Sequence, residues 1–216
     1  SGSDLILQSN GEDLVVGGLA TFASSVGVGV TPKTTSTSWK HLQIGGAGNI
    51  IGRSSSLSDA IFANNYYINS SNQDSYITTG GAARMFFNDN VISFEQASSG
   101  SADAPITWST PLTINSNQSA TFASTVTATN FILSSDKRLK EDIKKVDNKH
   151  IDVDWKTFEL KSDKGQKRYG VIAQELEVKN PEFVRTDDKG MKSVAYIDLL
   201  IAKIAELEER LNKVGI

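Results

Sequence analysis

The stretch with the densest chemical functionality is "SSDKRLKEDI" at residues 134–143. It places two serine hydroxyls beside an aspartate and the basic side chains of Lys137, Arg138 and Lys140. Such a stretch fits either a solvated linker or a site at which the chain is cut. The absence of cysteine excludes disulfides, thiol nucleophiles and cysteine metal sites. The chain has only two histidines, His41 and His150, which argues against a histidine-rich metal site, so we predict no metal and no cofactor.

The overall composition narrows the possible partners. A net charge of −3 provides no general attraction to nucleic acid. No segment approaches the run of about 18 apolar residues that a membrane span needs, so no membrane insertion is expected. Residues 1–2 resemble the remnant of an affinity tag and are left out of the fold prediction.

Charge and glycine are distributed very unevenly along the chain. Residues 1–134 hold 12 of the 47 charged residues and 13 of the 17 glycines. The remaining 82 residues hold the other 35 charges. Two segments with different physical properties therefore meet near Ser134, and the sequence predicts one domain at 1–134 and a second at 135–216.

The first segment has the pattern of short β-strands separated by Gly, Asn, Ser and Pro. The strand-like run "ATFASSV" at Ala20–Val26 returns as "ATFASTV" at Ala120–Val126. Strands this short and polar bury little apolar area in one chain. We therefore predict a mainly β fold in which several chains intertwine as an elongated obligate homo-oligomer, with a compact monomeric sandwich as the alternative.

Several aromatic residues in this segment are candidates for binding a receptor. Exposed rings can stack on a sugar or contact a protein. Packing in a core is the commoner fate of such side chains. The candidates are Trp39, Tyr66, Tyr67, Tyr76 and Trp108.

The second segment alternates short strand patterns with helical ones and ends in a heptad. Its apolar positions are spaced 3, 4, 3, 4 and 3 residues apart, at Ile197, Leu200, Ile204, Leu207, Leu211 and Val214. This spacing predicts a small α+β domain that ends in a long coiled-coil helix at about 197–214, with these residues as the seam between chains. The alternative is a helix that folds back on its own domain.

Four fragments in order resemble one known family. "SSDKRLKEDI", "YGVIAQELE", "PEFV" and "DDKGMKSVAYIDLL", followed by the heptad, are similar to the C-terminal intramolecular chaperone of phage endosialidases and tail fibres. This is the peptidase S74 family, whose domain also occurs in the myelin regulatory factor. The resemblance covers essentially all of 135–216. It implies that residues 1–134 form an intertwined trimeric β shaft or tip. It also implies a chaperone that drives homotrimerisation of this preceding fibre and then cuts itself off.

The resemblance also implies the site residues. The cleaved bond is that between Ser134 and Ser135, the catalytic serine–lysine dyad is Ser135 and Lys140, and Asp136, Arg138 and Leu139 complete the motif. A lysine can act as the base where burial or nearby cations favour its neutral form. Side chains five residues apart lie about 140° apart on a helix and on opposite faces of a strand, so the pair can meet only through a turn or across chains.

The expected function is that of a viral tail fibre or tailspike in the virion, made in the host cytoplasm. Its β part would bind a glycan or protein receptor on the host. A trimeric adhesin that is not cleaved is the first alternative. A self-cleaving transcription-factor precursor is a weaker one, because 1–134 has four basic and eight acidic residues and shows no membrane anchor.

Overall fold

The computed structural model describes residues 19–54, 58–146, 150–187 and 190–215. The chain divides into two compact units, Ser1–Phe131 and Ile132–Ile216. We call them the β domain and the C-terminal domain. The division lies close to the change in composition near Ser134.

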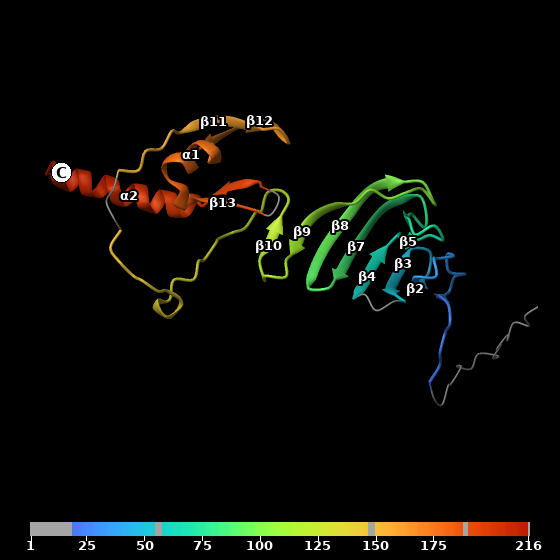
Figure 1. Ribbon diagram of the computed structural model, residues 1–216. Coiled ribbons are helices and arrows are strands. Elements are labelled where there is room, and N and C mark those ends of the chain that lie inside the picture. Colours follow the sequence, from blue (N-terminus) through green and yellow to red (C-terminus); the bar gives the residue numbers. More distant parts are fainter. Residues whose placement is uncertain (1–18, 55–57, 147–149, 188–189, 216) are drawn as a thin grey trace, which may run out of the picture. The chain divides into compact units, whose positions relative to one another are not determined.

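One eight-stranded sheet forms the β domain, with the order β1-β2-β3-β4-β7-β8-β9-β10. Neighbouring strands are antiparallel, except that β1 runs parallel to β2. Figure 1 shows the strands from β2 to β10 side by side in this order. The strands are β1 (Val26–Val28), β2 (Trp39–Ile44), β3 (Gly48–Arg53), β4 (Asp59–Asn64), β7 (Gly80–Asn88), β8 (Val91–Gly100), β9 (Ser109–Ile114) and β10 (Ala120–Phe122). The short strands β5 (Tyr67–Ile68) and β6 (Asp74–Ser75) pair separately.

The core of the β domain lies on one face of this sheet. Successive residues of a strand point to opposite faces, and alternate positions of β2, β3 and β4 are buried. The buried cluster consists of Trp39, Ile51, Ile61, Tyr66 and Ile68, with Ala63, Phe86, Ile106 and Trp108 packed against it. Tight turns connect β2 to β3 and β7 to β8. Gly45 and Asp89, which lie in these turns, adopt positive φ angles of 58° and 48°.

The C-terminal domain combines two hairpins and two α-helices around a small core. An extended segment with the 3-10 turn η1 (Lys137–Leu139) leads into the hairpin β11 (Lys156–Leu160) and β12 (Asp163–Gly170). The elements α1 (Ala173–Lys179), η2 (Pro181–Phe183), β13 (Val184–Thr186), β14 (Lys192–Val194) and α2 (Tyr196–Lys213) follow. The buried cluster is Ile151, Val171, Leu176, Phe183, Val184 and Leu199.

The predicted fold class is wrong for the N-terminal part of the chain. Its strands do not form an intertwined shaft, because β1–β4 and β7–β10 pair with one another in one open sheet within a single chain. The six- to ten-residue strands of the meander satisfy their hydrogen bonds with neighbours in sequence. The strand pattern in the sequence was correct, and its assignment to several chains was not.

The predicted long coiled coil is also wrong. Helix α2 is a single helix of 18 residues, and one of its sides packs on its own domain through Leu199, which is fully buried, and Glu206. The heptad residues lie elsewhere on the helix, with exposed fractions of 44% to 68% from Ile197 to Val214. The alternative of a helix that folds back on its domain therefore describes α2 better.

Two positions of α1 that are two residues apart, Leu176 and Val178, test which side of this helix packs on the core of the domain. Leu176 is 4% exposed and belongs to the core, whereas Val178 is 84% exposed. We expect Leu176→Ala to lower the free energy of unfolding by about 2–5 kcal/mol. Val178→Ala should change it by no more than about 0.5 kcal/mol. Denaturant unfolding of both variants measures the difference, and equal effects would contradict the assigned packing.

Candidate functional site

A tight turn brings the side chains of Ser135 and Lys140 together. The 3-10 turn η1 reverses the chain between them, closed by hydrogen bonds from the Leu139 N–H to the Asp136 carbonyl and from the Lys140 N–H to the Lys137 carbonyl, both 3.1 Å long. As a result the Lys140 Nζ donates a hydrogen bond of 2.6 Å to the Ser135 Oγ. The two residues therefore meet through a turn within one chain.

Asp136 holds this turn in shape. Its Oδ1 accepts a hydrogen bond of 2.9 Å from the Arg138 N–H at the start of η1. The Arg138 guanidinium binds both carboxylate oxygens, at 3.1 Å and 2.8 Å. These hydrogen bonds from the Arg138 side chain, and then its backbone, lower the pKa of Asp136. Asp136 and Arg138 therefore brace the loop between the two chemical groups, and Arg138 is occupied by this pairing.

The surroundings of the pair are open to water. Residues 131–146 are all exposed, including apolar side chains on both sides of Ser135. Ile132 is 89% exposed, Leu133 62% and Leu139 73%. Water stabilises the ammonium form of a lysine, whereas a general base has to be neutral. The described chain thus provides the contact between hydroxyl and amine without the dry surroundings that the chemistry needs.

A buried glutamate of α2 anchors the chain that follows this segment. Glu206 has a side chain only 3% exposed and accepts hydrogen bonds from His150 Nδ1 at 2.9 Å and from the Ile151 N–H at 3.2 Å. Lys203 Nζ donates to Glu206 at 2.6 Å and to the Ile151 carbonyl at 2.8 Å. The hydrogen bonds from Lys203 and then His150 lower the pKa of Glu206 to about 2. We call this arrangement the Glu206 latch.

The sequence analysis missed the latch, although a signal was present. The heptad pattern draws attention to the apolar residues of the helix and not to Glu206. It lies seven residues after Leu199, two helical turns along the buried side of α2. A charge at that spacing from a core leucine is expected to need partners.

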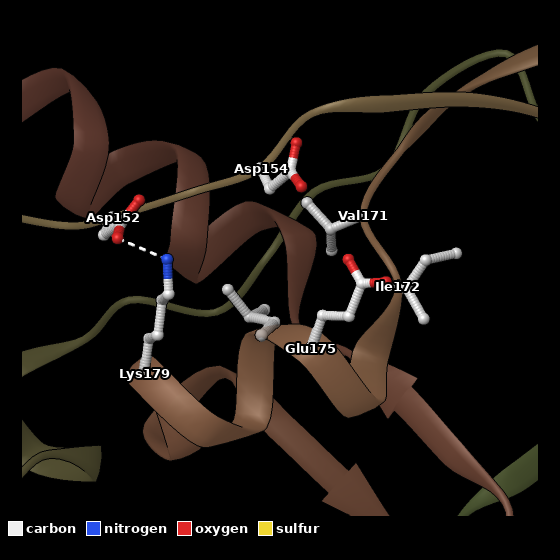
Figure 2. Close-up of a pocket in the computed structure, with 7 residues that line it drawn as sticks. Asp152, Asp154, Val171, Ile172, Glu175 and Lys179 are labelled. Atoms are coloured by element: carbon white, nitrogen blue, oxygen red, sulfur yellow. Dashed lines mark hydrogen bonds and ion pairs between the residues drawn. The ribbon is translucent and has the colours of Figure 1, made fainter.

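A pocket of about 230 Å³ lies beside α1, where none of the predicted site residues is found (Figure 2). Val171, Ile172 and Leu176 provide its apolar wall. Its three carboxylates, Asp152, Asp154 and Glu175, are paired with lysines: Lys179 binds Asp152, and Lys156 binds the other two. The pairing leaves the pocket without a free nucleophile or base among the residues that line it.

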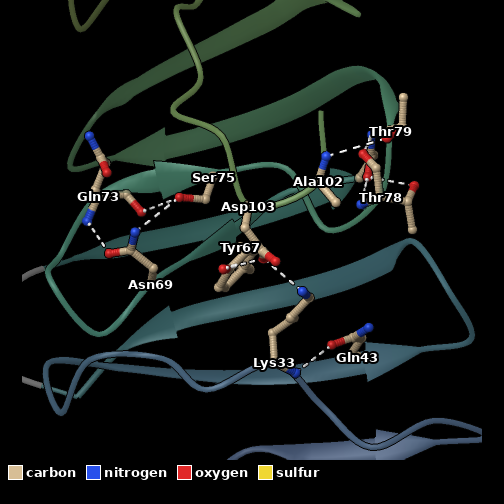
Figure 3. A network of polar contacts seen from close by, with 11 residues as sticks. Lys33, Gln43, Tyr67, Asn69, Gln73, Ser75, Thr78, Thr79, Ala102 and Asp103 are labelled. Atoms are coloured by element: carbon tan, nitrogen blue, oxygen red, sulfur yellow. Dashed lines mark hydrogen bonds and ion pairs between the residues drawn. The ribbon is translucent and has the colours of Figure 1, made fainter. Parts of the chain in front are cut away.

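The aromatic residues predicted to bind a receptor are placed in the core instead. Trp39, Tyr66, Tyr67 and Tyr76 are at most 6% exposed, and Trp108 packs edge-to-face on Tyr66 with ring centroids 5.3 Å apart. Their polar atoms are bonded internally: Tyr67 donates to Asp103 at 2.7 Å, beside an ion pair of Asp103 with Lys33 (Figure 3). These rings therefore offer no free faces to a ligand in the described chain.

Two acids that lie far apart in the sequence, Asp74 and Glu95, share one partner. Arg84 forms ion pairs with Asp74 at 3.0 Å and with Glu95 at 2.5 Å. Its guanidinium lies 4.3 Å from the centroid of the Trp108 ring, and the Trp108 N–H donates to Asp74 at 2.7 Å. The Arg84 side chain is only 9% exposed, so this cluster is internal structure and not an open site.

Within the described residues, no group of three or more His, Cys, Asp or Glu side chains is arranged to hold a metal. Over the same part of the chain, no helix combines the length and apolarity that crossing a membrane requires.

Comparison with known proteins gives one match. Residues 135–185 match the family model of peptidase S74, described as chaperone of endosialidase. The match begins at Ser135, includes Lys140 and the whole of α1, and ends before β14 and α2. It supports a chaperone domain in the C-terminal part of the chain. No curated protein and no solved structure matches.

The Glu206 latch predicts a pH dependence of stability. The pKa of Glu206 is lowered from 4.5 to about 2 in the folded chain, so the folded state favours the ionised carboxylate. The contribution is fully present above pH 4.5 and is lost as the pH falls through about 2. Thermal unfolding between pH 2 and 7 should show Glu206→Gln less stable than the unmodified chain at pH 7, with the difference shrinking below pH 4.5.

Glu208→Gln is the matched control, since Glu208 is an exposed residue of the same helix. We expect no comparable loss at pH 7. A difference between the unmodified chain and Glu206→Gln that stays constant down to pH 2 would contradict the latch.

Proposed function

We propose that the C-terminal domain is an intramolecular chaperone that assembles three copies of the chain and is then released by cleavage between Ser134 and Ser135. The observation that carries the proposal is the 2.6 Å hydrogen bond between Lys140 Nζ and Ser135 Oγ, at the first residue of the family match. The family supports a trimerisation chaperone with possible autocleaving activity. The assignment of the two residues rests on their contact and on the motif.

The reaction can be written with the chain's own groups. Neutral Lys140 accepts the hydroxyl proton of Ser135, and the Oγ attacks the carbonyl carbon of Ser134. The proton passes to the departing amide nitrogen of Ser135, so the peptide bond breaks and an ester forms. Water then hydrolyses the ester, which leaves a carboxylate on Ser134 and a free amine and hydroxyl on Ser135.

Assembly would supply the condition that the single chain lacks. The apolar side chains beside the bond are exposed in one copy, and so are the heptad residues of α2. Three copies that bury these side chains against one another would also remove water from Lys140. Loss of water favours the neutral amine. Cleavage would therefore follow assembly, and a chain that has not assembled would stay intact.

The exposed heptad side of α2 is the surface that we assign to contact between copies in the C-terminal domain. Leu199 and Glu206 hold another side of the helix on its own domain. Ile197, Leu200, Ile204, Leu207, Leu211 and Val214 remain free for neighbours in the described chain. A stripe of this size on one helix is typical of a surface that is covered in an assembly.

The wider role that we propose is that of a viral tail fibre or tailspike. The β domain would be the part that stays in the virion, and its host receptor would be a glycan or a protein. Support comes from the order of the two domains: a β-rich domain precedes the match to the chaperone of endosialidase.

The assigned dyad makes a direct prediction. Ser135→Ala should abolish cleavage completely while the chains still assemble, because it removes the attacking oxygen. Lys140→Arg should also abolish it, since arginine keeps the charge but cannot become neutral. A denaturing gel with intact mass measurement identifies fragments that break before Ser135.

Ser134→Ala and Lys137→Arg are the matched controls, and both should be cleaved. Ser134 contributes only its carbonyl, and the lysine that binds the Ser135 hydroxyl is Lys140 and not Lys137. Processing of Ser135→Ala at the same bond would show that the assignment is wrong.

Dependence of cleavage on assembly makes a second prediction. During refolding, the cleaved fraction should rise with protein concentration, because separate chains have to meet first. Ile204→Asp, which places a charge on the exposed side of α2, should reduce both assembly and cleavage. Val178→Asp places the same charge on an 84% exposed position of α1 and should change neither.

Light scattering on the same samples gives the number of chains. Complete cleavage of Ile204→Asp in a monomeric sample, at a rate independent of concentration, would refute the coupling.

A further inference from the structure

The β domain carries an unbroken apolar row across all eight strands of its sheet. Residues paired across neighbouring strands point to the same face of a sheet. One such set of pairs runs from edge to edge of the sheet with an apolar residue in every strand. In strand order it is Val26, Leu42, Ile50, Phe62, Met85, Phe94, Leu112 and Phe122.

A second apolar row lies beside the first. It occupies positions two residues away in β4 and in β7–β10, which point to the same face. Its members are Ala60, Phe87, Ile92, Ile114 and Ala120. The corresponding positions of β3 and β2 hold Gly52 and Lys40. Phe62 of the first row packs edge-to-face on Phe87 of the second, with ring centroids 6.1 Å apart. We call the two rows together the apolar sheet face.

This face lies opposite the core of the β domain. Ile51 and Ile61, which alternate with Ile50 and Phe62 along β3 and β4, are each 1% exposed. By contrast, Phe62 is 48% exposed, Phe94 38% and Phe122 50%. Side chains of a sheet already shield one another sideways, so these fractions show that no described residue of the β domain itself lies over these three rings.

The face is large for an apolar surface that a lone domain leaves in water. Its exposed side chains amount to on the order of 600 Å², at the upper limit of the largest apolar patch on a typical monomer. Each partner of a standard protein–protein interface contributes about 800 Å². A hollow of about 460 Å³ lies on this face, and Phe62, Met85, Phe94 and Pro111 are among the residues that line it. Side chains of a partner can fill this hollow.

The chemistry of the face selects its occupant. From β4 to β10 neither row contains a charged residue, and Lys40 in β2 adds a single cation, which is too little charge to attract a nucleic acid or an acidic glycan. A flat, uncharged sheet face packs well on another sheet face. Every copy of the chain carries the same face, and the domain matched by residues 135–185 suggests that copies are brought together.

From this we infer that the apolar sheet face is the surface through which the β domains of neighbouring copies contact one another. The number of copies, three, rests on the proposed function. The use of this face does not, because it depends only on the sheet register and the exposure. In this arrangement the strands of each copy stay in their own sheet, and only the faces meet.

The absence of native cysteine allows a clean test in the full chain. Phe62→Cys, made in a Ser135→Ala background so that both domains stay joined, places one thiol in the middle of the face. In the assembled protein this thiol should react with a bulky maleimide at least about tenfold more slowly than after unfolding in denaturant. Val178→Cys, 84% exposed on α1, is the control and should react at similar rates in both states.

Light scattering on each sample separates the possible results. A slow thiol in a multi-chain particle supports the inference. A fast thiol in a multi-chain particle overturns it, because the copies then meet elsewhere. A slow thiol in a monomer also overturns it, because residues 1–18 or another segment of the same chain then cover the face.

A charge on the face gives an independent readout. Phe62→Asp combined with Phe94→Asp should make the thiol of Met85→Cys react with the maleimide at least about tenfold faster than it does without the two charges. Circular dichroism verifies that the sheet is intact. An unchanged rate in a folded, multi-chain sample overturns the inference. The state of the bond at Ser135, read by mass in the chain without Ser135→Ala, decides the proposed function separately. A chain that is never cleaved can still bury this face.

Discussion

A lysine can take a proton from a serine only after water has left the pair, and this requirement links the parts of the structure. The turn η1 brings Lys140 to the Ser135 hydroxyl, and Asp136 and Arg138 keep the turn closed. Nothing among the described residues of the C-terminal domain covers the pair. The contact is therefore present in each chain, and under the proposed function the dry environment would come from other copies. Exposed apolar side chains around the bond and along α2 are consistent with such a covering.

The two domains reach stability by different means. The C-terminal domain has a small apolar core and adds the Glu206 latch, in which one buried carboxylate fixes the incoming chain at His150 and Ile151. The β domain buries an arginine between two acids and an aromatic ring, which satisfies the charges on the covered face of the sheet. Its other face is apolar and has no equivalent cover. The part that is least complete alone is thus the β domain, which precedes the chaperone domain in the chain.

The sequence was most informative where the signal is local. The strand pattern of residues 1–134, the change of composition near Ser134 and the helix at the C-terminus are each visible in short windows. The pairing of β2 to β10 within one chain was not visible, because alternation shows that a strand has two unlike faces and not which strand lies beside it. The buried fate of Trp39 and Tyr66 depends on that pairing. For α2, the heptad stripe was easier to recognise than the narrower stripe of Leu199 and Glu206 that holds the helix on its domain. The contact of Ser135 with Lys140 depends on a 3-10 turn, which has no apolar period to reveal it.

The order of strands in the sheet has a consequence for synthesis on the ribosome. From β2 to β4 and from β7 to β10, each strand pairs with its successor, so the sheet depends mainly on contacts close in sequence, which form quickly. Nascent chains emerge with their N-terminal part first, and the sheet can therefore be complete before α2 has left the exit tunnel. During that interval the apolar sheet face is exposed while the end of the C-terminal domain has not yet been synthesised. Slow translation of the last part of the message would lengthen the time for which the face stays exposed. If copies contact one another through this face, neighbouring ribosomes on one message would shorten the time that the copies need to meet.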